Sequence, residues 1–327
     1  MADDIVISTG SDVSRAPQVS VIMPAYNTAS LIADALDSVF AQTYTDFEVI
    51  VVNDGSPDTN QLEKVLEPYR SRLVYIVQKN KRAAGARNTA IQHARGEYLA
   101  FLDSDDLWEP RNLSYQMERL EQDPSLDMIY ADAAFFESMS KRARTYMDEC
   151  PSKGPVSFES VVVEDTQVCI SCTIVRKKAL TEAGLFDESL RRCDDYDLWL
   201  RLAHAERKIT YHKEVLGKIR PGRPDSLGAS EIAMLEAAAE ILSGLERKLS
   251  LTPGQKELVE RRISFHRALR DRLMARRFLA QGDYARAAES LAKANAFFKS
   301  SKLTLGLLGL RLAPRLVRAI TNTRDAS

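Results

Sequence analysis

The sequence predicts an α/β protein with a doubly wound, mixed but mostly parallel sheet, followed by an all-helical C-terminal region. Two observations predict this class. Apolar, β-rich runs alternate with helical patterns through residues 18–225, with short polar turns between them, which is typical of a parallel sheet covered by helices on both faces. Residues 229–327 then carry almost no β signal. The length of 327 residues suits roughly two domains.

The alternation begins with two buried strands. Val19–Met23 is an apolar run closed by a proline, and Phe47–Val52 is a second run, closed by the turn sequence NDGSP. Between them, Asn27 is expected to cap a helix that continues to Val39. Further strands are expected at 73–78, 98–102 and 168–175, and further helices at 61–69, 84–94, 110–122, 177–183 and 195–205.

The expected organisation is a flexible leader at 1–17, an α/β domain at 18–225 and a helical region at 229–327, with a helix-turn-helix around Gly282. The stretch RPGRP at 220–224 breaks regular structure and is the candidate boundary. The helical region has 18 Lys and Arg against 10 Asp and Glu, so the net charge of −1 combines a basic tail with an acidic α/β domain. Because there is no overall basic field, nucleic acid is not an expected partner.

Composition also indicates the compartment. Cysteine is sparse, which suits a reducing cytoplasm. Cys169 and Cys172 have a CxxC spacing, which leaves buried free thiols and a structural zinc site as the two interpretations. The N-terminus is acidic and polar, and it lacks the basic start and apolar run of a signal peptide. We therefore expect a cytoplasmic protein.

The most apolar segment is LTLGLLGLRLAPRLVRAI at 303–320. Three arginines and a proline interrupt it, so a membrane-spanning helix is not expected. Basic residues flank its leucines, which is typical of a peripheral helix on anionic lipid at the inner face of the membrane. Packing of this helix on its own domain, or on the second subunit of a homodimer, is the alternative.

Polar clusters follow three of the predicted strands. Tyr26, Asp54 and Asp103 each stand near a strand end, and the carboxyl ends of parallel strands share one edge of the sheet, where ligands collect. The cluster DSDD at 103–106 sets three carboxylates within four residues, which repel one another unless a cation neutralises them. A hard divalent cation that also binds diphosphate oxygens fits this pattern. A solvated acidic turn before the next helix is the alternative.

Three further segments carry charge at the ends of elements. Asp54 can accept a hydrogen bond from a nucleotide base, or only shape a tight turn. The basic residues at 79–82 and Arg87 enter a helix, an arrangement that suits phosphate as well as a solvated loop. Asp194 and Asp195 open another helix, so either they cap it or a carboxylate accepts a proton from an attacking hydroxyl.

Four stretches of the chain together form one pattern. They are VSVIMPAYN (19–27), FEVIVVNDGSPD (47–58), ARNTAIQHARGEYLAFLDSDDLWEP (86–110) and AGLFDESLRRCDDYDLWLRL (183–202). In this order and spacing they resemble the family 2 glycosyltransferases, which share the GT-A fold. The resemblance covers residues 18–225. Three positions depart from it. Asp194 stands where the family's acidic pair usually has a glutamate, which shortens the side chain by one methylene. Arg82 stands where the family usually has a glycine, and the loop KIRPGRPDS lacks the family's histidine, so Arg220 or Arg223 is a candidate to clamp the diphosphate instead.

The resemblance implies a role for each matching residue. Asp195 would be the general base, while Asp194 and Trp199 would contact the acceptor. Asp105 and Asp103 would hold a Mg²⁺ or Mn²⁺ ion. The residues implied for the nucleotide sugar are Pro24, Ala25, Tyr26, Asp54, Arg82, Arg87, Asp103 and Ser104.

The implied activity is metal-dependent, inverting transfer of a sugar from a nucleotide-diphosphate donor, most often a UDP-sugar in this family, to a hydroxyl of a glycan or lipid-linked acceptor. Such a reaction would serve the synthesis of a cell-surface polysaccharide or glycoconjugate. One alternative is a catalytically degenerate protein that binds nucleotide sugar and assembles partners through its helical tail. A nucleotidyltransferase is the other, although MPAYNTAS at 23–30 lacks the glycine-rich, basic loop such an enzyme would need.

Overall fold

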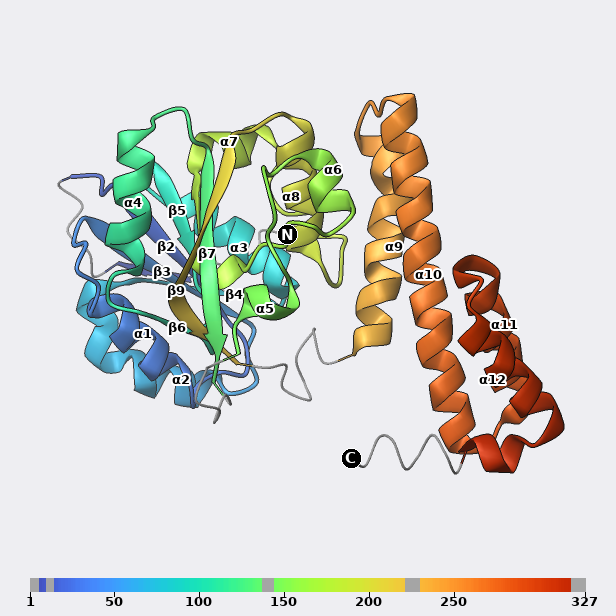
Figure 1. The fold of residues 1–327 in the computed structure, drawn as a ribbon. Coiled ribbons are helices and arrows are strands. Elements are labelled where there is room, and N and C mark those ends of the chain that lie inside the picture. The colour runs from blue at the N-terminus through green and yellow to red at the C-terminus, as the bar shows by residue number, and fades with distance from the viewer. Residues whose placement is uncertain (1–5, 10–14, 137–143, 221–229, 319–327) are drawn as a thin grey trace. The chain divides into compact units, whose positions relative to one another are not determined.

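The computed structural model describes residues 6–9, 15–136, 144–220 and 230–318 (Figure 1). Its contacts divide the chain into two compact units, Met1–Pro224 and Asp225–Ser327. The predicted boundary sequence at 221–224 lies outside the described residues. Most of the predicted leader also lies outside them, but Val6–Thr9 forms the edge strand β1, so a flexible leader does not describe these four residues.

The first unit contains one mixed sheet, and the predicted fold class is confirmed. Its central strands follow the order β4-β3-β2-β5 and are all parallel. Beyond β5 the order continues β8-β7-β9-β6, with β8 antiparallel to both neighbours and β7 parallel to β9. The described strands are β1 Val6–Thr9, β2 Val19–Ala25, β3 Phe47–Asp54, β4 Val74–Gln78, β5 Tyr98–Phe101, β6 Leu107–Trp108, β7 Met128–Phe135, β8 Thr173–Arg176 and β9 Ile209–Ile219.

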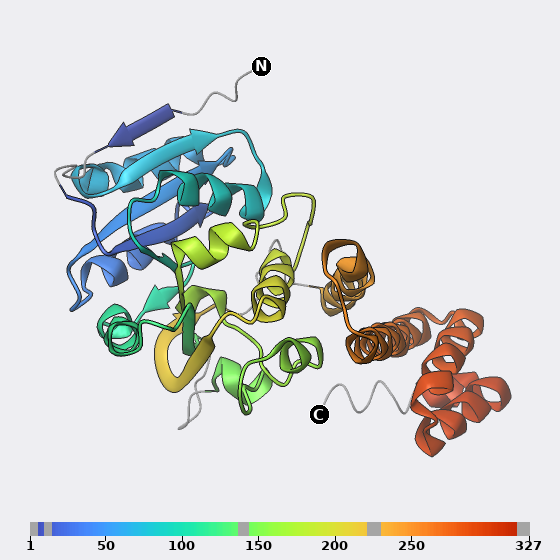
Figure 2. The ribbon, with the colours of Figure 1, turned by 90° about the horizontal axis from the view of Figure 1, so that it is seen from above.

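Helices cover both faces of this sheet (Figures 1 and 2). Val21 and Val49 belong to a core cluster with side chains of α1, α2 and α4. Their neighbours Ile22 and Ile50 point to the other face, since side chains alternate along a strand, and they are equally buried. Helix α3 contacts β2 and β3. The helices of this unit are α1 Ile32–Phe40, α2 Thr59–Leu66, α3 Arg82–His93, α4 Asn112–Gln122, α5 Tyr146–Glu149, α6 Phe158–Val162, α7 Lys177–Glu182 and α8 Asp194–His204.

Most predicted bounds in the first unit differ from the observed ones by no more than three residues, and two elements differ by more. The first helix begins at Ile32, and Asn27 does not cap it: Asn27 has a left-handed backbone (φ 54°), and Thr28 O accepts the first amide bonds. The strand predicted at 168–175 is only β8, because Cys169 O accepts bonds from the Cys172 amide and a nearby threonine hydroxyl and so winds this segment into a 3-10 turn. Strands β6, β7 and β9 were not predicted.

The second unit is helical in its described part, with α9 Glu231–Lys248, α10 Pro253–Gln281, α11 Tyr284–Phe298 and α12 Ser301–Leu312. Helix α9 lies beside α10 (Figure 1). Helix α10 starts at a capping box on Thr252 with a proline in its first turn, and it ends at Gly282, whose φ of 82° suits glycine. This turn confirms the predicted helix-turn-helix. No described helix combines the length and hydrophobicity that crossing a bilayer requires.

The helix predicted at 303–320 is two pieces. Helix α12 ends at Leu312, and a short helical stretch at 314–318 follows Ala313. Pro314 has no amide hydrogen to continue the ladder of α12, which explains the break. Residues 319–320 lie outside the described part of the chain.

Candidate active site

The predicted strand-end residues lie along one edge of the sheet. Ala25 pairs with Asn53 in neighbouring parallel strands, and Ile22 pairs with Phe101 on the other side of β2. Tyr26, Asp54 and the DSDD loop therefore follow the adjacent strands β2, β3 and β5 at their carboxyl ends. The side chain of Tyr26 is half exposed at this edge.

Asp54 ends β3 and is almost fully buried. Its Oδ1 accepts a hydrogen bond from Gln78 Nε2 at 2.6 Å and another from the Lys81 amide at 2.8 Å. Burial raises the pKa of this carboxyl, and the two hydrogen bonds oppose that rise. Asp54 thereby ties the end of β3 to the end of β4 and to the start of α3.

The loop after β2 is held against the loop after β3. Ser56 Oγ accepts a bond from the Asn27 amide at 2.7 Å, and Asp58 Oδ2 accepts one from the Ala29 amide at 2.8 Å. These bonds fix the backbone that follows Pro24 and Ala25. The backbone of the segment predicted to line a nucleotide base is therefore held in place beside Asp54.

The DSDD loop presents two of its carboxylates and buries the third. Ser171 Oγ donates to Asp106 Oδ2 at 2.6 Å, and the Arg220 amide donates to Asp106 Oδ1 at 2.9 Å. Burial, together with the charges of Asp103 and Asp105, raises the pKa of Asp106 well above its usual range. Asp103 and Asp105 are partly exposed, so they can meet a ligand, whereas Asp106 holds the loop in place.

Two further contacts position this loop. Arg220 Nε donates to the backbone oxygen of Asp105 at 2.9 Å, and its guanidinium lies 4.1 Å from the ring centre of Phe136. Ser104 Oγ donates to Thr28 Oγ1 at 2.9 Å, which links the loop to the segment after β2. Of the two arginines predicted to clamp diphosphate, Arg220 thus contacts the loop itself, and Arg223 lies outside the described residues.

The buried guanidinium of Arg87 joins two predicted site carboxylates. Arg87 Nη2 lies 2.8 Å from Asp103 Oδ1, and Nη1 lies 2.9 Å from Asp194 Oδ2. The charges of both carboxylates raise the pKa of Arg87 above its usual value, against the effect of burial. Arg87 therefore brings the loop after β5 and the first turn of α8 to one place.

Asp195 follows Asp194 in the first turn of α8. Burial raises the pKa of Asp195 to about 6, the charge of Asp194 adds to the rise, and the charge of Arg87 opposes it. Its Oδ1 accepts a bond from the Tyr196 amide at 2.9 Å. A carboxylate with a pKa near neutrality is suited to accept a proton from a hydroxyl.

Two further predicted site residues lie at the extremes of exposure, and the backbone of one of them, Arg82, hydrogen-bonds the Asp54 carboxylate. The indole of Trp199 is 3% exposed, so its ring packs in the interior and presents no face to an acceptor in this structure. Arg82 is exposed at the start of α3 and has a left-handed backbone with φ 63°. That backbone explains why a glycine suits this position.

Sequence reasoning missed three residues around the site. Ser171 contacts both Asp106 and the Asp103 amide, and Thr28 meets Ser104. Burial raises the pKa of Tyr146 well above its usual range, and the charges of Cys150, Cys169 and Asp195 add to the rise. Tyr146 begins the four-residue helix α5 and Ser171 lies in a 3-10 turn; elements this short carry no periodic pattern, so no signal in the sequence identifies these two residues.

The donor atoms of the site fit a divalent cation bound together with substrate. Among the described residues, no group of three or more Asp, Glu, His or Cys side chains is placed to hold a metal alone. Asp103 and Asp105 offer hard carboxylate oxygens, the ligand type that Mg²⁺ and Mn²⁺ take. Mg²⁺ commonly binds one or two carboxylates and completes its shell with water and substrate phosphates.

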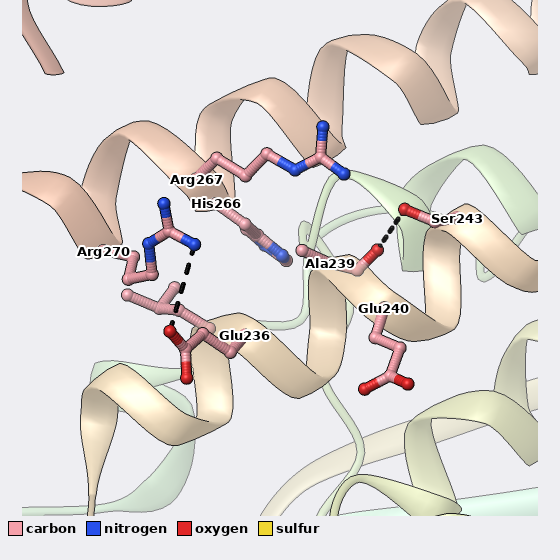
Figure 3. A pocket seen from close by; sticks show the side chains of 8 residues that line it. Glu236, Ala239, Glu240, Ser243, His266, Arg267 and Arg270 are labelled. Carbon is pink, nitrogen blue, oxygen red and sulfur yellow. Dashed lines mark hydrogen bonds and ion pairs between the residues drawn. The ribbon is translucent and has the colours of Figure 1, made fainter. Parts of the chain in front are cut away.

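A separate cavity of about 350 Å³ lies between α9 and α10 in the second unit (Figure 3). Figure 3 shows Arg270 of α10 reaching toward Glu236 of α9, with a nitrogen-to-oxygen distance of 3.9 Å. His266 and Arg267 also line this cavity. None of the predicted site residues does, so it is distinct from the residues joined by Arg87.

The comparisons with known proteins agree with this fold. The family profile described as Glycosyl transferase family 2 matches residues 20–182. An uncharacterized glycosyltransferase of Rickettsia typhi is 30% identical over 260 residues, which cover 78% of each chain. The chain therefore belongs to glycosyl transferase family 2.

Solved structures show the same fold at lower identity. S. aureus TarS 1–349 in complex with UDP-GlcNAc has a TM-score of 0.62 at 18% identity, over 94% of this chain and 92% of that one. The mannosyltransferase PcManGT from Pyrobaculum calidifontis, in complex with GDP-Man and Mn²⁺, has a TM-score of 0.61 at 20% identity, over 100% of this chain and 92% of that one. The fold is thus of the GT-A glycosyltransferase type.

Proposed function

We propose that the protein is an inverting glycosyltransferase that moves a sugar from a UDP-sugar to a hydroxyl of a glycan or lipid-linked acceptor. One observation carries the proposal: Arg87 contacts both Asp103 and Asp194, which brings the loop suited to a donor diphosphate next to the suited base Asp195. Family membership and the nucleotide-sugar complexes of TarS and PcManGT support the donor class.

The first unit, predicted as the domain at 18–225, would bind the donor at the strand ends. The backbone at 24–26 and the half-exposed Tyr26 would line the base, and Asp54 would accept a hydrogen bond from a base N–H. Asp54 is suited to this because the bonds from Gln78 Nε2 and from the backbone of Lys81 and Arg82 hold its carboxylate as an ordered acceptor at the end of β3. Exposed Arg82, at the N-terminus of α3, would face the phosphates.

Asp103 and Asp105 would hold a Mg²⁺ or Mn²⁺ ion, which when bound offsets the charge that develops on the departing diphosphate. The ion pair of Arg87 Nη2 with Asp103 Oδ1, at 2.8 Å, fixes this carboxylate in place. The Arg220 guanidinium holds the backbone of Asp105. These contacts set the geometry of the two carboxylates before substrate arrives.

Asp195 would remove the proton of the acceptor hydroxyl as that oxygen attacks the anomeric carbon. The nucleoside diphosphate would leave from the opposite face of the sugar, so a single displacement inverts the configuration. Asp194, fixed by Arg87, would orient Asp195 and contact the acceptor. Reaction in the cytoplasm, or at the inner face of a membrane where a cell-surface polysaccharide is built, suits the buried free thiols of Cys169 and Cys172.

Donor turnover tests the proposal. The wild type should hydrolyse or transfer from a UDP-sugar with Mn²⁺ or Mg²⁺, and Asp195→Asn should lower kcat about 100-fold or more while donor binding remains. Exposed Asp165, changed to Asn, is a matched control that should keep the wild-type rate. A wild-type rate for Asp195→Asn would eliminate Asp195 as the base. Full activity in excess chelator would eliminate the metal, and binding of UDP-sugars without turnover would favour the degenerate binding protein.

A further inference from the structure

Helix α12 packs on its own unit through one face only. Leu310 is buried in a cluster with Leu279 of α10 and Ala287 of α11. A Cβ added at Gly306 would lie 3.3 Å from Leu291, so this face approaches α11 closely. At about 100° per residue, Gly306 and Leu310 lie on the same side of the helix. The packed face therefore has its partner within the second unit.

The opposite face of α12 carries an exposed stripe of leucines. Leu305, Leu308 and Leu312 are 67%, 49% and 83% exposed and lie within about 60° of one another around the helix axis. Leu316, in the helical stretch after Pro314, is 61% exposed. These four side chains, called the leucine stripe here, are most of the large apolar side chains that the described residues expose.

Positive charge borders the leucine stripe. Lys302 and Arg311 lie on opposite sides of it around the helix, and exposed Arg315 precedes Leu316. Residues 290–324 contain seven Lys or Arg and no Asp or Glu. An apolar stripe with basic borders is complementary to a surface whose apolar interior lies beneath a layer of negatively charged groups.

We propose that the leucine stripe and its basic borders bind the surface of an anionic lipid bilayer, with α12 lying in the plane of the interface. The charge pattern selects this occupant over a second copy of the chain, because two copies of this face would bring their basic borders together. A helix of 12 residues is also too short to cross a bilayer, which requires about 20 residues. The inference does not depend on the proposed glycosyl transfer.

Vesicle flotation of the full chain tests the inference. The wild type should float with phosphatidylglycerol vesicles and much less with neutral phosphatidylcholine vesicles, and added salt should weaken the binding. The triple variant Leu305→Ser, Leu308→Ser, Leu312→Ser should bind at least about tenfold more weakly. Because these side chains are exposed, its thermal unfolding should match that of the wild type. Val215→Ser, at an exposed apolar residue of β9, is the control and should float normally.

Charge is tested separately. Changing Lys302, Arg311 and Arg315 to Gln should remove the preference for anionic vesicles. Changing exposed Lys64, Lys178 and Lys213 of the first unit to Gln makes the same change in net charge and should leave that preference in place. Absence of vesicle binding, or equal binding by the leucine variant, would overturn the inference. So would a dimer in sedimentation that the leucine variant abolishes while no vesicle is bound.

Discussion

Replacing Arg87 by Met should destabilise the first unit and shift the pH dependence of turnover. The guanidinium is buried and lies 2.9 Å from Asp194 and 2.8 Å from Asp103. Methionine fills a similar volume with no charge. Both carboxylates then lose the cation that offsets their burial, and Asp194, with a side chain only 9% exposed, has little water to replace it.

The magnitude follows from the exposure of the two carboxylates. Removing one partner of a buried ion pair costs about 3–5 kcal/mol. Asp103 is 33% exposed and regains water, so the lower end, about 3 kcal/mol, is expected for Arg87→Met. In a unit of this size that loss corresponds to a fall in Tm of about 6–12 °C. Arg87→Lys should lose less, because an ammonium keeps one contact but cannot span both carboxylates.

A double-mutant cycle with Asp194→Asn separates the ion pair from packing. If the pair is direct, the combined variant should be at least about 1 kcal/mol more stable than the sum of the single losses predicts. Thermal unfolding at neutral pH measures all four proteins. A Tm for Arg87→Met within about 2 °C of the wild type, or additive losses, would refute the reasoning.

Arg87→Met should also change the pH dependence of kcat, which a change in packing alone would not shift. The charge of Arg87 lowers the pKa of Asp195, which is about 6 in the intact protein. Without Arg87 that pKa should rise further, so the acid limb of the kcat profile should move to higher pH. An unmoved limb would show that Asp195 does not govern it.

Three further predictions concern single substitutions. Asp195→Asn should raise the Tm at about pH 8 while it lowers turnover, because the raised pKa means that this carboxyl stabilises the fold below about pH 4 and loses that contribution as pH rises through about 6; a lower Tm would contradict this. Arg82→Gly should stabilise the protein by about 1 kcal/mol at its φ of 63°, and an increase in the donor KM would assign Arg82 to the phosphates, whereas an unchanged KM would exclude it. Gly217→Ala should destabilise it by about 1–3 kcal/mol, since a Cβ there would lie 2.5 Å from Cys172 Sγ and 3.0 Å from Leu107 O; an unchanged urea midpoint would contradict that.

The central sheet could be predicted from the sequence because its strands are buried on both faces. Strands β2 and β3 are nearly continuous apolar runs, interrupted by Ser20 and Glu48. Their parallel pairing places their carboxyl ends together, which brings Tyr26 and Asp54 to the same edge of the sheet, as predicted. Strand β9 escaped prediction because lysine and glutamate residues interrupt it and much of it is exposed. Strand β7 was not predicted because its alanines and Asp132 weaken the β signal of the sequence. Asp132 is tolerated inside this buried strand because its Oδ1 accepts hydrogen bonds from the Ala133 and Met147 amides.

The roles of the acidic residues could be predicted only in part, because residue type gives the chemistry and environment decides which carboxylate a ligand meets. Asp103, Asp105 and Asp106 are the same residue type in one short loop, but Asp106 alone among these three is buried against Ser171 and the backbone of Arg220. Arg220 lies 114 positions further along the chain. Residue spacing in the sequence does not predict a contact between positions this far apart.

The pairing of Arg87 with Asp194 spans 107 positions and has the same character. In the sequence, Arg87 is a basic residue that enters a helix, and this pattern is the same for a residue that binds phosphate and for one that forms a structural ion pair. The structure shows that one guanidinium pairs with both Asp103 and Asp194, so Arg87 fixes two carboxylates, one of which is the neighbour of Asp195. Donor and acceptor sides of the proposed reaction are therefore coupled through a single buried charge, and their geometry should change together when that charge is removed.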